Sequence, residues 1–132
     1  MKKDDLIYYL GFSYCLGIGP MTFQVLKVHP KGVRGAYTAS AKELIPMIGQ
    51  RLTEKFIEFR RRFDPKKELE KLKKEGITVL AVDGEDYPES LKNISDPPIC
   101  IYVKGDSNKF AQHKTRSQNF LSLVGKEKFF FA

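Results

Sequence analysis

The chain has 132 residues and a formal net charge of +7, which suits one ordinary domain or a small domain with part of another. Apolar residues make up 42% and charged residues 30%, a balance that excludes a disordered chain. No apolar run approaches the roughly 20 residues of a membrane-spanning helix, and residues 1–5 do not resemble a signal peptide. We therefore expect a cytoplasmic protein without a membrane partner.

The first 62 residues carry the pattern of an all-helical domain. Asp4 or Asp5 can cap a first helix, because apolar residues recur at helical spacing over residues 6–15. Residues 16–19 interrupt the pattern, and Pro20 suits the first position of a second helix, which ends near residue 29.

Two further helices are expected before residue 64. Ser40 and Glu43 have the spacing of a capping box, which predicts the start of a short helix. Gly49 then turns the chain into a longer helix with an apolar stripe over residues 52–63.

Residues 63–132 predict the opening of a second domain. Asp64 and Pro65 can start a helix that Gly76 ends. Continuous apolar runs at 77–82, 99–103 and 120–125 then predict strands covered on both faces, with a turn, a short helix and a proline-rich linker between the first two. We expect an α+β to α/β chain, with a helical domain over 1–62 and an incomplete parallel sheet over 63–132.

The junction of the first two helices resembles a helix-hairpin-helix. Two glycines can adopt positive φ and expose backbone N–H groups at the start of the second helix, where a DNA phosphate could bind without any base being read. The alternative is a close turn between helices with no ligand. The candidate DNA-binding residues are Gly17, Ile18, Gly19, Lys27, Lys31 and Arg34, with Ile18 plugging the turn into the core.

The basic excess lies in residues 1–60 and 107–132, whereas 61–106 is nearly balanced. Such charge favours attraction to polyanions without sequence specificity, although a solvated basic surface is an equal alternative. The first helix is also rich in aromatic residues. They could stack on unpaired bases, but their spread around the helix favours core packing.

Catalytic, metal and cofactor sites are not indicated. Cys15 and Cys100 lie in apolar patterns and read as small buried residues, and the two histidines lack companions at ligand spacing. An acidic cluster from Asp83 to Asp86 follows the first strand, but no nucleophile or phosphate loop accompanies it, so a solvated turn is favoured over a general base or a magnesium site. We expect a protein that is not an enzyme.

Several motifs together resemble the front of the DNA-processing protein A family (DprA, also called Smf). They are the Gly17-Ile18-Gly19-Pro20 hairpin, the helix that ends at residues 76–80, and residues 86–106 with Tyr87-Pro88, Asp96-Pro97-Pro98 and Gly105. The resemblance implies a sterile-alpha-motif-like (SAM-like) helical domain followed by a Rossmann-like domain. It also implies a bacterial, non-catalytic role in natural transformation and DNA recombination, with single-stranded DNA and the recombinase RecA as partners of full-length relatives.

The resemblance weakens at the end of the chain. Lys126 and Glu127 follow Gly125, where the family has a hydroxyl residue and an arginine that help to bind DNA. Glutamate would repel phosphate there, so the single-stranded DNA pocket and the dimer and recombinase surfaces do not carry over. We therefore expect a truncated member that binds DNA weakly. A protein-interaction module without DNA binding and a non-functional truncated product are the alternatives.

Overall fold

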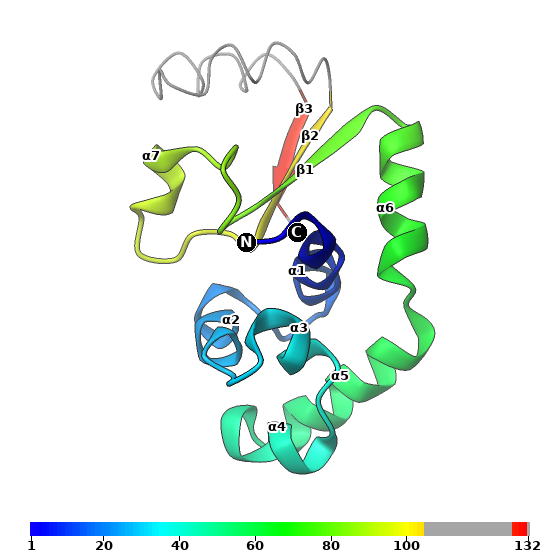
Figure 1. Ribbon diagram of the computed structural model, residues 1–132, viewed down its shortest axis with the longest axis vertical. Coiled ribbons are helices and arrows are strands. Elements are labelled where there is room, and N and C mark those ends of the chain that lie inside the picture. Colours follow the sequence, from blue (N-terminus) through cyan, green and yellow to red (C-terminus); the bar gives the residue numbers. More distant parts are fainter. Residues whose placement is uncertain (105–127, 132) are drawn as a thin grey trace.

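The computed structural model of this chain describes residues 1–104 and 128–131 (Figure 1). The first part is helical and comprises η1 (Lys3–Asp5), α1 (Leu6–Tyr14), α2 (Pro20–Lys27), α3 (Gly32–Tyr37), α4 (Ala41–Ile48) and α5 (Gln50–Arg62). The second part comprises α6 (Pro65–Lys74), β1 (Ile77–Ala81), α7 (Glu89–Lys92), β2 (Cys100–Lys104) and β3 (Lys128–Phe131). Among the described helices, none combines the length and apolar character that crossing a bilayer requires.

The helix starts and ends follow the local sequence signals. Ser40 and Glu43 form the predicted capping box of α4, in which Glu43 Oε2 accepts the Ser40 N–H at 3.1 Å. Gly49, at φ 87°, joins α4 directly to α5. Asp64 caps α6 by accepting the N–H groups of Lys66 and Lys67. These predictions are confirmed, because each depends on contacts within a few residues.

One helix was not predicted. The sequence suggests that helix structure ends near residue 29, yet α3 follows within a few residues. Its six residues include Gly32 and Gly35, which lower helix propensity. The packing of Val33, Ala36 and Tyr37 into the core stabilises it nevertheless.

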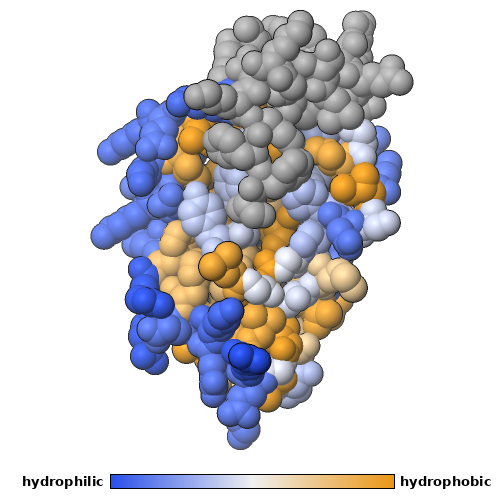
Figure 2. All heavy atoms as spheres, turned by 180° about the vertical axis from the view of Figure 1, so that it is seen from behind, coloured by the Kyte–Doolittle hydropathy of each residue, from blue (hydrophilic) through white to orange (hydrophobic). Residues whose placement is uncertain are grey.

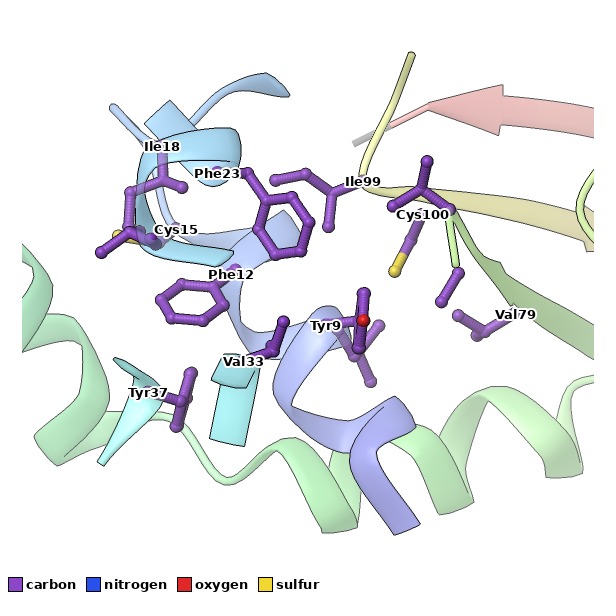
Figure 3. Packing of buried hydrophobic residues seen from close by; sticks show 14 of the residues in the cluster. Tyr9, Phe12, Cys15, Ile18, Phe23, Val33, Tyr37, Val79, Ile99 and Cys100 are labelled. Atoms are coloured by element: carbon purple, nitrogen blue, oxygen red, sulfur yellow. The ribbon is translucent and has the colours of Figure 1, made fainter. Parts of the chain in front are cut away.

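Aromatic side chains meet in the core of the helical part, among aliphatic residues such as Ile18 and Val33 (Figure 3). The Phe12 ring stacks on Phe56 at a centroid distance of 5.2 Å and meets the Tyr37 ring edge-on at 5.1 Å. The ring of Phe23 in α2 also packs against Phe12, at a centroid distance of 5.9 Å. Tyr9 and Phe12 are buried, and Tyr8 and Tyr14 are partly buried against the same cluster, which confirms that the aromatic residues of the first helix serve core packing.

The described strands form one antiparallel sheet in the order β1-β2-β3. The expected parallel pairing is therefore wrong for these strands. Ala81 at the end of β1 is paired with Cys100 at the start of β2, because the intervening segment returns the chain to the same end of the sheet. Two hydrogen bonds, both 2.9 Å long, hold the ends of this segment together. Val82 N donates to Ile99 O, and Tyr87 Oη donates to Pro98 O.

A parallel crossover would instead have to run the full length of the sheet, usually as a substantial helix. The segment here contains only the four-residue α7. The third strand expected over residues 120–125 lies outside the described residues. The strand paired with β2 is instead formed by residues 128–131, with Phe130 opposite Tyr102.

Helix α1 connects the helical part to the sheet. It packs against α3 on one side and against α6, β1 and β2 on the other, and Figure 1 shows it between them. Ser13 and Tyr102 hydroxyls lie 2.6 Å apart in the buried contact between α1 and β2. The buried apolar residues of both parts form one continuous cluster. The fold is thus mostly helical α+β, while a division at residue 62 and the SAM-like and Rossmann-like assignments remain predictions.

Candidate nucleic-acid interface

The hairpin between α1 and α2 has the predicted position but only part of the predicted backbone. Gly17 has φ 98°, a conformation that favours glycine, whereas Gly19 is extended at φ −102°. Ile18 is 5% exposed and its N–H bonds to Cys15 O, so it plugs the turn into the core as expected. The N–H groups of Gly17 and Gly19 make no hydrogen bond within the described chain.

The exposed side chains that flank Gly17 and Gly19 in the sequence are apolar. Leu16 is 84% exposed and Met21 is 72% exposed. Lys27 lies at the other end of α2, where its Nζ is 2.7 Å from Asp83 Oδ1. Lys27 is therefore engaged by a carboxylate within the protein.

Asp83 also has a role that the sequence did not indicate. Besides the Lys27 ammonium, it accepts a 2.7 Å hydrogen bond from Tyr9 Oη. Burial opposes ionisation of Asp83, but the bonds from Lys27 and Tyr9 outweigh it and hold the pKa of the carboxyl below its usual value. Asp83 is thus a partly buried structural acceptor, not a solvated turn residue.

The last two predicted residues lie elsewhere. Lys31 is exposed, and its backbone N–H bonds to His29 Nδ1. The Arg34 guanidinium lies 5.8 Å from the centre of the Tyr8 ring. The structure therefore distributes the six predicted residues over the hairpin, the Asp83 contact and the surface of α3, and only the hairpin residues lie together.

Arg34 belongs to a surface depression that we term the basic groove. Two adjoining hollows of about 640 and 520 Å³ share Ile7, Tyr8 and Lys66. They run along α1 between α3, the end of α5 and α6. The basic residues that line them are Lys3, Arg34, Arg60, Arg61, Arg62, Lys66 and Lys73, against the acidic residues Asp4, Asp64 and Glu70.

The charges in the basic groove differ in availability. Arg60 donates to the carbonyl oxygens of Tyr37 and Ala39 at 2.6 and 2.8 Å, and burial lowers the pKa of its guanidinium. Asp64 caps α6, and its side chain accepts the backbone N–H groups of Lys66 and Lys67. Arg62 lies 3.5 Å from Glu58.

Four other cations remain accessible. Each is exposed, and no carboxylate of the described chain lies within 4.0 Å of it. They are Lys3, Arg61, Lys66 and Lys73. Cations with this freedom can turn toward a bound anion without breaking an internal pair.

The floor of the basic groove is partly aromatic. Tyr8 is half-buried, and its ring centre lies 5.5 Å from that of Tyr37. The Arg34 guanidinium covers the Tyr8 ring, as in a cation–π contact. Sequence reasoning missed this groove because its residues come from five separate segments. The local signals were the run of arginines at 60–62 and the lysines after Pro65.

Within the residues described, no three His, Cys, Asp or Glu side chains are grouped as a metal site would require. The two cysteine thiols are buried, which disfavours their ionised form. Burial raises the pKa of Cys15 to about 11 and that of Cys100 to about 12.

Comparison with known proteins gives one informative match. The chain is 29% identical over 107 residues to Protein Smf of Synechocystis sp., a match that covers 80% of this chain. The resemblance to the DprA/Smf family is confirmed. The match covers 27% of the relative, so the chain corresponds to about a quarter of that protein's length. No family model and no solved structure matches the chain.

Proposed function

We propose that this chain is a non-catalytic DNA-binding module of the DprA/Smf type, acting in DNA processing during transformation and recombination. The observation that carries the proposal is the basic groove, where accessible cations line a continuous hollow beside an aromatic floor. Most of the residues that line the basic groove belong to α1, α3, α5 and α6. Because these helices pack together, the cations have a fixed arrangement.

Phosphate binding suits this surface better than base recognition. Lysine and arginine side chains on several helices can follow a sugar–phosphate backbone, and they carry no sequence information in doing so. Affinity of roughly 10⁻⁴ to 10⁻⁶ M at physiological salt is expected for such contacts. In full-length relatives, RecA would be a further partner, as the family resemblance implies.

The absence of catalysis is part of the proposal. Asp83 is the acid that the sequence offered as a general base, and it is held by Tyr9 and Lys27. Cys15 and Cys100 have raised thiol pKa values, which disfavour the nucleophilic thiolate.

The hairpin is a second candidate contact for the same ligand. The free N–H groups of Gly17 and Gly19 could donate hydrogen bonds to a phosphate oxygen, as the sequence pattern suggests. The exposed apolar side chains of Leu16 and Met21 on either side of it favour the basic groove as the principal site. A Gly19→Val variant separates the two, because residue 19 has negative φ and open space around it, so the added side chain covers the amides without straining the turn.

The test is fluorescence anisotropy with labelled oligonucleotides over a series of salt concentrations. Removing two groove charges with Arg61→Gln and Lys66→Gln should weaken binding about tenfold and reduce the slope of log K against log salt by about 2, since each phosphate contact contributes about 0.9. A matched control is Lys42→Gln with Lys71→Gln, two exposed lysines outside the groove.

Equal losses in the groove and control variants would show that only net charge matters and would overturn the assignment of the site. A loss confined to Gly19→Val would move the site to the hairpin. If the parent chain shows no salt-dependent binding, the proposal of DNA binding is overturned.

A further inference from the structure

A second groove lies on the other side of α5, and we term it the Leu16 groove. It has a volume of about 620 Å³ and lies between the end of α1, the hairpin and the exposed face of α5. Tyr14, Leu16 and Phe59 supply its apolar lining. Seen from behind, the molecule has hydrophobic side chains in the middle of its face and a hydrophilic margin on the side of α5 and α6 (Figure 2).

Among the described residues, Leu16 is the most exposed large apolar side chain, with an exposed fraction of 84%. Leu16 lies in the turn between α1 and α2. In the same turn, Ile18 is buried and Gly17 has a positive φ that favours glycine. The turn is therefore fixed while its Leu16 side chain remains in water. Burying an apolar side chain of this size in a contact is favourable, so Leu16 is suited to anchor a ligand.

The charged residues on the rim indicate the charge of that ligand. Glu54 accepts a hydrogen bond from Gln50 Nε2 at 3.2 Å, and Glu58 lies 3.5 Å from Arg62 Nε. Glu54 thus has a hydrogen-bond donor within α5, and Glu58 has an ion-pair partner there. Arg51 and Lys55, one helical turn apart, have no carboxylate within 4.0 Å in the described part of the chain.

We propose that the Leu16 groove binds an acidic amphipathic helix of a partner protein. The partner's apolar face would lie on Tyr14, Leu16 and Phe59, and its carboxylates would pair with Arg51 and Lys55. A groove with an apolar floor and charges at helical spacing on its rim is the usual receptor for an amphipathic helix.

Two other occupants fit this surface less well. A nucleic acid needs a continuous line of cations, whereas Arg51 and Lys55 alternate with Glu54 and Glu58 along this rim. A second copy of this chain would place the same two cations of α5 opposite each other, since a twofold contact brings identical patches together.

The probe is a fluorescein-labelled helical peptide with leucines on one face and glutamates on the other, measured by anisotropy. A version with lysine in place of glutamate tests the charge preference. The glutamate peptide should bind at least about tenfold more tightly, a difference of about 1.4 kcal/mol. Similar affinity for both peptides, or no binding of the glutamate peptide, would overturn the proposal.

Two pairs of variants locate the site. Arg51→Glu with Lys55→Glu should weaken peptide binding about tenfold or more, whereas Lys67→Glu with Lys74→Glu changes the net charge equally on exposed positions of α6 and should have little effect. Leu16→Asn should weaken binding, and Met21→Asn, which changes another exposed apolar residue outside the groove, should not.

Circular dichroism confirms that these surface variants remain folded. Equal losses in the two charge variants, or in the two apolar variants, would contradict a defined groove. Oligomers that require Leu16 in size-exclusion chromatography would assign the surface to a second copy, and displacement of the peptide by an oligonucleotide that also requires Arg51 and Lys55 would assign it to nucleic acid.

Discussion

Tyr9 and Asp83 lie 74 positions apart in the sequence, yet the Tyr9 hydroxyl donates a 2.7 Å hydrogen bond to the Asp83 carboxylate. The second carboxylate oxygen accepts the Lys27 ammonium at the same distance. One side chain after β1 therefore fastens both α1 and α2. Burial, followed by the bond to Asp83, raises the pKa of the Tyr9 hydroxyl, so it remains a donor at any physiological pH.

Replacing Asp83 with asparagine should destabilise the fold at neutral pH. The amide keeps the shape of the side chain but removes the charge that both donors face, and the expected loss is about 1–2 kcal/mol of unfolding free energy. Urea unfolding of both proteins at pH 7 measures it. Equal stabilities would show that the contact makes no net contribution.

The same pair of proteins should show a defined pH dependence. The pKa of Asp83 is lower in the folded state, so its contribution is complete above the unfolded value of about 3.9 and is lost as the pH falls through the folded value. The stability difference between parent and Asp83→Asn should thus shrink below about pH 4. A difference that persists at lower pH would mean that the contact does not depend on the carboxylate charge.

Gly11 marks a close approach between α1 and α3. A Cβ atom there would lie 2.6 Å from the Tyr37 hydroxyl and even closer to its ring, and Tyr37 is only 4% exposed. Gly11→Ala should therefore destabilise the protein by about 1–2 kcal/mol, although alanine normally favours helix by up to about 1 kcal/mol. Gly19→Ala is the control, because nothing lies within 4 Å of that position. Thermal unfolding compares the two.

Two buried tyrosines should respond in opposite ways to the loss of their hydroxyl group. Tyr102 Oη lies 2.6 Å from Ser13 Oγ, so Tyr102→Phe should cost about 1–2 kcal/mol. Tyr37 Oη is buried without a hydrogen-bond partner among the described residues, so Tyr37→Phe should be neutral or slightly stabilising. Chemical unfolding measures both, and a large loss for Tyr37→Phe would reveal a partner for its hydroxyl.

The two cysteines should be inert in the native protein. Burial raises the pKa of both thiols, so the thiolate that reacts with Ellman's reagent is scarce at pH 8. Reaction should be at least about a hundredfold slower than in urea. Cys15→Ser isolates the signal of Cys100, and fast reaction of either thiol would show that the core opens readily.

Local sequence signals predicted most elements to within a few residues. Asp64, Pro20 and the Ser40–Glu43 pair act over one helical turn, so their effect can be read directly from the sequence. The strand direction could not, because apolar runs have the same appearance in parallel and antiparallel sheets. It depends on where the segment between β1 and β2 returns, which the distant contact from Tyr87 to Pro98 fixes.

The site was harder to predict for a related reason. The hairpin could be placed from Gly17 and Pro20, but the charge around it could not. Lys27 is next to the hairpin in sequence yet is neutralised by Asp83, which is 56 positions away. Arg34 and Lys66 come together only because α1 holds α3 and α6 on its two sides.

The central position of α1 also has a consequence for how the protein is made. Its nine residues leave the ribosome before the elements that pack on them, and the hydrogen-bond partners of their side chains lie 54 to 89 positions later, in Glu68, Asp83 and Tyr102. A helix this short is marginal in water when isolated. The packing of α1 is therefore complete only after the synthesis of β2, and until then the side of the helix that faces the sheet is available to chaperones.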